Sequence, residues 1–114
     1  MAKDPRIPLR DILESCDRII ANVNGVSAEE FEHNINLQDA VIRRFEIIGE
    51  AVKRVPSSIR KLYPHIAWKE AAGFRDILIH DYPEVVIDQV YLTGKNQLPE
   101  FRAQIQAVLD TAAK

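Results

Sequence analysis

Apolar residues recur at three- and four-residue steps through most of this 114-residue chain. This spacing places apolar side chains on one face of an α-helix, and no segment shows the alternation of a β-strand. The first such stripe consists of Leu9, Ile12, Leu13, Cys16, Ile19, Ile20 and Val23. We expect a helix over residues 8–24, ended by Gly25. The apolar period therefore predicts an all-α protein.

Prolines, glycines and capping residues divide the rest of the pattern into further helices. These are expected over residues 27–33, 37–55, 57–63, 66–81, 83–94 and 98–109. Ser27 and Glu30 have the spacing of a capping box. Ser57 and Ser58 are expected to cap a short helix, and Gly94 is expected to end a longer one. Because the connections are short, we predict an antiparallel bundle of four to five main helices.

The composition is that of an ordinary globular protein. Hydrophobic residues make up 46% and charged residues 28% of the chain, so we expect a single folded domain over residues 1–114. The formal net charge of −2 argues against a protein whose overall positive field binds duplexes. The single cysteine and three separated histidines predict no disulfide, metal site or cofactor. Without a signal peptide or membrane span, we expect a soluble cytoplasmic protein.

Polar side chains gather at the end of the helix expected over residues 66–81. Asp76 and His80 are four residues apart on one helical face, so the carboxylate can accept a hydrogen bond from the imidazole and favour its protonated form. Arg75 lies about 140° round the helix from His80. The Arg75 guanidinium therefore needs a partner other than His80. This partner could be an acidic residue such as Glu46 or Glu50, or it could be a phosphate. From the residues alone, a helix cap and a catalytic site both fit this pattern.

Other features are interpreted as structural. Basic residues form a loose string that consists of Arg43, Arg44, Lys53, Arg54, Arg60 and Lys61. We interpret this string as a solvated face, with a local RNA-binding patch as the alternative. Trp68 and Phe74 are expected in the core rather than stacked on bases. Cys16 is expected to pack in the core as well.

Three stretches of the sequence carry a resemblance to a known family. "FRDILIHDY", residues 74–82, resembles the Arg-x4-His-x-Tyr signature of the HEPN superfamily, and more narrowly its HepT toxin branch. "DAVIRRFEIIGEAVKRVP", residues 39–56, is similar to the long helix of that family. "YPHIAWKEAAGFRDILIHDY", residues 63–82, is similar to its helix before and through the motif. The resemblance implies a helical bundle that pairs as a homodimer, with the two motifs facing each other across a cleft.

The resemblance also implies an activity and a role for each motif residue. It implies a metal-independent endoribonuclease, the toxin of a toxin–antitoxin module of the type II or VII kind. Arg75 would hold the scissile phosphate, His80 would transfer protons, and Asp76 would position the pair. The attack would come from the RNA 2′-hydroxyl. A nucleotidyltransferase antitoxin would transfer AMP to Tyr82, and the added charge would repel RNA.

Two other functions also fit the sequence. The first is a non-catalytic nucleotide-binding or scaffold subunit of a nucleotidyltransferase complex, with Tyr82 as its modification site. The second is a plain helical dimerisation module, in which Arg75 and His80 affect only stability. These alternatives differ from the endoribonuclease in one measurable respect, because neither of them cleaves RNA.

Overall fold

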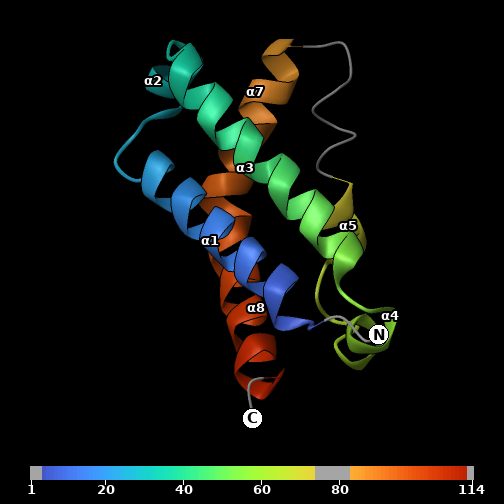
Figure 1. Ribbon diagram of the computed structural model, residues 1–114. Helices are drawn as coiled ribbons and strands as arrows, with labels where there is room; N and C mark the ends of the chain where they lie inside the picture. Colours follow the sequence, from blue (N-terminus) through green and yellow to red (C-terminus); the bar gives the residue numbers. More distant parts are fainter. Residues whose placement is uncertain (1–3, 74–82, 113–114) are drawn as a thin grey trace.

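Every regular element in the described part of the chain is a helix (Figure 1). The computed structural model describes residues 4–73 and 83–112. The elements are α1 (Arg6–Val23), α2 (Ala28–Glu32), α3 (Ile35–Arg54), α4 (Ser57–Leu62), α5 (Trp68–Ala72), α7 (Pro83–Leu92), the π-helix η1 (Thr93–Gln97) and α8 (Leu98–Ala112). The predicted all-α fold is confirmed.

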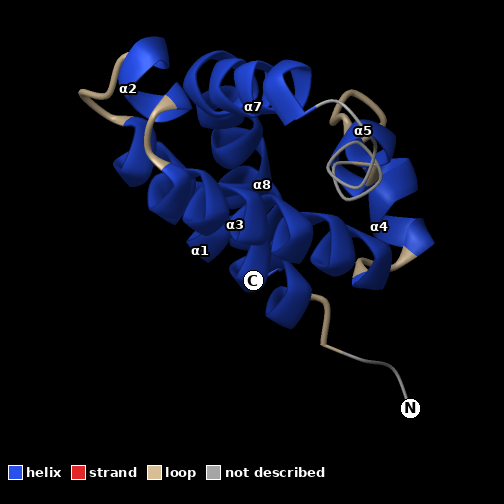
Figure 2. Ribbon diagram, turned by 90° about the horizontal axis from the view of Figure 1, so that it is seen from above, coloured by secondary structure: helices blue, strands red, loops and turns tan. Residues whose placement is uncertain are grey.

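Three long helical stretches form the body of the bundle (Figures 1 and 2). Helix α1 packs against both α3 and α8, and it runs opposite in direction to each of them in Figure 1. The short helix α2 packs against α3 and α7, whereas α5 packs against α3. Figure 1 shows α2 at one end of the molecule and α4 at the other. The predicted antiparallel bundle is therefore confirmed.

The predicted apolar stripes form one continuous core. Its largest fully buried side chains are Phe31, Phe45, Leu9, Ile12, Ile19, Ile48, Leu98, Ile105, Val41, Val52, Val55 and Val108. Burying each such side chain stabilises the fold by about 1.5–3 kcal/mol relative to leaving it exposed. Cys16 and Trp68 also lie in this core, which confirms both predictions. None of the helices described is long and apolar enough to span a membrane.

Polar caps fix the starts of α2 and α3. The Glu30 amide donates to Ser27 Oγ at 3.1 Å and the Ser27 amide donates to Glu30 Oε1 at 3.2 Å, so the predicted capping box is confirmed. Helix α3 begins at Ile35, two residues before the expected start. The reason is Asn34, whose side chain accepts a hydrogen bond from the Leu37 amide at 3.0 Å and so caps the helix.

The prediction that serines cap α4 was wrong. The N-cap is Pro56, and neither Ser57 nor Ser58 precedes the helix, since both lie within its first turn. The Pro56 carbonyl accepts the first hydrogen bonds, from the amides of Ile59 at 3.0 Å and Arg60 at 3.1 Å. A proline tolerates this position because the first amides of a helix have no partner within the helix.

The prediction that Gly94 ends a helix was also wrong. The chain passes from α7 through η1 into α8 without leaving helical structure. Gly94 is buried in η1 against α1, and a Cβ atom added there would lie 3.1 Å from Ile19 Cγ2 and 3.7 Å from the nearer Val23 methyl. The glycine therefore permits a close approach between two helices instead of a change in chain direction.

The π-helical turn accommodates a proline inside this long helical stretch. The Leu98 amide donates to the carbonyl of Thr93, five residues earlier, and Pro99 follows immediately. A proline cannot donate to the carbonyl four residues earlier, and its ring clashes with that carbonyl in a regular α-helix. We attribute the wider turn to this conflict, because π-turns form where the regular ladder is interrupted.

Candidate functional site

The four predicted site residues lie outside the described residues. Arg75, Asp76, His80 and Tyr82 all fall between the two described ranges. The predicted pairing of Asp76 with His80 therefore remains a prediction, as does the expected core position of Phe74. The structure describes the helices on either side of this nine-residue segment, α5 before it and α7 after it, and we call these two helices the frame.

Helix α5 forms the first side of the frame. Trp68 is buried, and its indole Nε1 donates a hydrogen bond of 3.0 Å to the Tyr63 carbonyl. Ala71 is buried one turn later, and α5 packs against α3. At the end of the helix the Gly73 amide still donates to the Lys69 carbonyl at 3.0 Å. The chain thus enters the motif segment from a helical turn that is fixed to the core.

Helix α7 forms the second side of the frame. It begins at Pro83 and packs against η1, α2 and α3. The Tyr91 hydroxyl donates to the Val26 carbonyl at 2.6 Å, and the Tyr91 ring lies 5.5 Å from the Phe31 ring. An aromatic pair with a satisfied hydroxyl holds the helix strongly. Both helices that flank the motif segment are therefore anchored on the same bundle, and both contact α3.

The two carboxylates proposed as partners of Arg75 lie one turn apart on α3. Glu46 Oε2 lies 3.6 Å from Arg43 Nη1, in an ion pair within the helix. Glu50 follows four residues later on the same helix and is exposed. Helix α3 contacts both of the helices that flank the motif segment. The contact of either carboxylate with Arg75 remains a prediction.

The described residues offer no metal site. No cluster of three or more His, Cys, Asp or Glu side chains suited to a metal occurs in residues 4–73 and 83–112. His33 Nδ1 lies 2.9 Å from the Glu29 carbonyl and closes the end of α2. The ring of His65 lies edge-on to Tyr63, with 6.4 Å between ring centroids. Both histidines have local structural contacts, and they lie in different parts of the chain, His33 just after α2 and His65 between α4 and α5.

The sequence of residues 12–108 matches the family described as Ribonuclease HepT-like. This range covers most of the chain and includes all four motif residues. The chain belongs to the HepT-like ribonuclease family. The resemblance on which the motif was assigned is thereby confirmed at the level of the family.

Relatives of this HepT-like chain match over most of its length. "Putative RNase MJ1216" of Methanocaldococcus jannaschii is 43% identical over 107 residues, which cover 94% of this chain and 88% of the relative. "Putative RNase TTE0752" of Caldanaerobacter subterraneus is 40% identical over 107 residues, which cover 94% of this chain and 96% of that protein. "Probable ribonuclease HepT" of Thermococcus cleftensis is 37% identical over 98 residues, covering 86% and 89%. No solved structure matches the chain.

A cavity of about 310 Å³ lies between α5 and the η1–α8 stretch of this HepT-like chain. Its polar lining includes His65, Glu70, Asn96, Glu100 and Gln104. Residues about thirty positions apart meet here, so no local spacing in the sequence signals it. The carboxylates of Glu70 and Glu100 would repel the phosphates of a nucleotide, because like charges repel at short distance. The described lining therefore gives no support to nucleotide binding in this cavity.

Proposed function

We propose that this chain is a metal-independent endoribonuclease and the toxin of a toxin–antitoxin module. The family match over residues 12–108 carries the proposal, because that range contains the complete motif segment. The names of the relatives support a ribonuclease, and α5 and α7, the helices on either side of the motif segment, are both anchored on the bundle. The composite active site would lie in the cleft of a homodimer.

The proposed reaction uses the RNA itself as the nucleophile. The 2′-oxygen bonds to the adjacent phosphorus, and the 5′-oxygen of the next nucleotide leaves. The products are a 2′,3′-cyclic phosphate and a 5′-hydroxyl. One His80 accepts the 2′-hydroxyl proton, and a second His80, in its protonated form, donates a proton to the leaving oxygen. Arg75 stabilises the charge that develops on the phosphate oxygens.

A homodimer would bring an Arg75 and a His80 to the same phosphate, which one helix cannot do. On a regular helix Arg75 points about 140° away from His80, so the two side chains of one protomer do not converge on one phosphate. A second motif facing the first brings another Arg75 and another His80 to the same cleft. Asp76, four residues before His80, holds the imidazole of its own protomer in place.

The proposed control of this toxin acts on Tyr82. Pro83 is the first residue of α7, and a residue before a proline is driven away from helical geometry. We expect Tyr82 to be open to a minimal nucleotidyltransferase antitoxin that transfers AMP to its hydroxyl. The added phosphate brings negative charge and bulk beside His80, and so prevents an RNA phosphate from binding.

The alternative is a non-catalytic nucleotide-binding or scaffold subunit of a nucleotidyltransferase complex. A nucleotide-binding subunit needs a site for a nucleotide, and the described cavity presents Glu70 and Glu100 to any phosphate that enters. The endoribonuclease needs no such cavity, because its substrate binds at the protomer boundary. The charge of the cavity therefore argues against this cavity as a nucleotide site, and RNA cleavage by the purified chain separates the endoribonuclease from a scaffold subunit.

A growth experiment tests the proposal. The chain is induced alone in a host without the antitoxin, beside its His80→Ala and His33→Ala forms at matched expression. We expect the wild type and His33→Ala to arrest growth and His80→Ala to permit it. His33 is a suitable control because it lies at the end of α2, remote in sequence from the motif. Unimpaired growth with the wild type would overturn the toxin proposal.

A further inference from the structure

Charge is distributed unevenly along the bundle, although the net charge of the chain is only −2. Residues 24–42, which include α2 and the start of α3, contain four carboxylates and no lysine or arginine. Residues 51–73, from the end of α3 through α5, contain five lysines and arginines and one carboxylate. These two segments lie toward opposite ends of the molecule in Figure 1. The protein therefore has an acidic end and a basic end.

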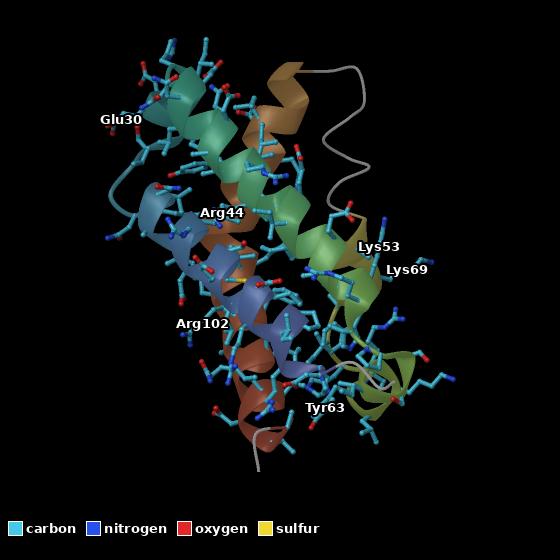
Figure 3. All side chains as sticks on the ribbon, in the orientation of Figure 1. Glu30, Arg44, Lys53, Tyr63, Lys69 and Arg102 are labelled. Atoms are coloured by element: carbon cyan, nitrogen blue, oxygen red, sulfur yellow. The ribbon has the colours of Figure 1, made fainter. Side chains whose placement is uncertain are left out.

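Three lysines at the basic end are exposed and without a described partner. Lys53 lies on α3, Lys61 on α4 and Lys69 on α5, and none forms a hydrogen bond or ion pair with another residue in the described ranges. Figure 3 shows Lys53 and Lys69 close together, with their side chains directed away from the bundle. Because α3 packs against α5, lysines sixteen positions apart reach one surface.

Several arginines of the chain are engaged with carboxylates. Arg18 pairs with Glu14 at 3.2 Å, and Arg102 pairs with Asp17 at 2.9 Å. Even Arg54, at the basic end, pairs with Asp11 at 3.1 Å. An ammonium group that is already exposed and unpaired has no internal ion pair to break when it meets a phosphate. Lys53, Lys61 and Lys69 can thus meet an external anion without the loss of an ion pair described in the structure.

The single carboxylate of the basic segment does not neutralise this surface. Glu70 follows Lys69 directly, and successive residues of a helix point about 100° apart. Glu70 lines the cavity on the side of η1 and α8, whereas Lys69 points outward in Figure 3. The Glu70 carboxylate therefore does not offset the positive charge of Lys69, its neighbour in the sequence.

Two aromatic rings lie between Lys61 and Lys69 in the sequence, but they are set apart from Lys53 and Lys69 in the structure. Tyr63 is half-buried and His65 is exposed, and the two rings meet edge to face with centroids 6.4 Å apart. His65 lines the cavity together with Glu70, and Figure 3 shows Tyr63 well below Lys53 and Lys69. The surface that Lys53 and Lys69 form is therefore one of cations without stacking rings, which suits contact with phosphates rather than with bases.

We propose that Lys53 and Lys69 bind the phosphates of single-stranded RNA and lead it toward the motif segment. Lys69 lies six residues before Arg75 in the sequence, so this surface directly precedes the proposed catalytic residues. The inference rests on the proposed ribonuclease function and names the surface that holds its substrate outside the reacting phosphate. For Lys53, a member of the basic string, it takes up the alternative of a local RNA-binding patch in place of a solvated face.

The test measures the salt dependence of RNA binding in the non-cleaving His80→Ala background. The probe is a fluorescein-labelled 20-nucleotide polyuridine, titrated by fluorescence anisotropy between 0.05 and 0.4 M salt. The logarithm of affinity falls with the logarithm of salt concentration by about 0.7 per phosphate contact in a single strand. For Lys53→Gln combined with Lys69→Gln, we expect the slope to shrink by about 1.4 and the affinity at 0.1 M salt to fall about 25-fold.

The matched control is Arg18→Gln combined with Arg102→Gln, which removes the same charge from α1 and α8. Figure 3 shows Arg102 on the opposite side of the molecule from Lys53 and Lys69. We expect the control to keep its slope, with melting by circular dichroism confirming that both variants are folded. Equal losses in the two double variants would overturn the proposal, because net charge alone would explain them. An unchanged slope in the lysine variant would overturn it as well.

Cleavage of the same RNA by the wild type separates this proposal from the proposed activity. Cleavage with no effect of the lysine variant on the slope refutes the binding surface and leaves the ribonuclease in place. Binding that depends on Lys53 and Lys69, without any cleavage, supports the surface and refutes the ribonuclease.

Discussion

Gly94→Ala probes the close contact between α1 and η1, the π-helical turn that joins α7 to α8. Alanine favours a helix over glycine by about 1 kcal/mol, so an open site would be stabilised by the change. At this site the new Cβ would lie 3.1 Å from Ile19 Cγ2, and 3.7 and 4.0 Å from the two Val23 methyl groups. Ile19 is completely buried and Val23 almost so, so neither side chain has solvent to move into.

Overpacking in a dense core costs about 1–3 kcal/mol, which exceeds the gain in helix propensity. We therefore expect Gly94→Ala to lower the free energy of unfolding by about 1 kcal/mol, or Tm by about 4 °C. The assay is thermal and urea unfolding followed by circular dichroism. A rise in Tm would refute the reasoning, because it would show that the helices separate at little cost.

A double-mutant cycle identifies the contact responsible. Ile19→Leu keeps the side-chain volume but removes the Cγ2 methyl that the new Cβ would meet. We expect Gly94→Ala to cost less in the Ile19→Leu background than in the wild type, with a coupling of about 0.5–1 kcal/mol. Costs that simply add would show that the strain arises elsewhere.

Two further predictions concern the core. Burial raises the pKa of the Cys16 thiol to about 12, so we expect Cys16 in the folded protein to resist a thiol reagent at pH 8 and to react once urea unfolds the chain. Rapid labelling of the folded protein would contradict the burial of this thiol. Since the folded-state pKa lies above the ordinary value of 9.0, the free energy of unfolding should also fall as pH rises between about 9 and 12. Trp68→Phe removes the donor to the Tyr63 carbonyl and should cost about 1–2 kcal/mol in urea unfolding, whereas an unchanged midpoint would show that the hydrogen bond contributes nothing.

The sequence predicted the elements whose signals are local. The apolar period located the long helices, and the spacing of Ser27 and Glu30 located the capping box that the structure contains. The role of Gly94 was mispredicted because a glycine that ends a helix and one that admits a neighbouring helix look alike in sequence. Only the packing of Ile19 against it, from a distant part of the chain, distinguishes the two.

In the candidate site, too, the sequence predicted the local features and missed those that depend on how the helices pack. Its motif is local, and the sequence assigned Arg75, Asp76, His80 and Tyr82 from their spacing and the family resemblance. The nearness of Lys53 to Lys69 depends on how α5 packs against α3, so the sequence showed only a loose basic string. The cavity beside Glu70 depends on the approach of α8, and no local spacing predicts that contact.

Cleavage of RNA by the purified chain in the presence of EDTA tests the central claim most directly. The labelled RNA is incubated with wild type, His80→Ala and His33→Ala, and the oligomeric state of each is measured by light scattering. We expect the wild type and His33→Ala to cleave, with 2′,3′-cyclic phosphate ends, and His80→Ala to remain a dimer but to lose at least 100-fold in rate, the scale of general acid–base catalysis. Equal cleavage by the wild type and His80→Ala would contradict the proposed mechanism.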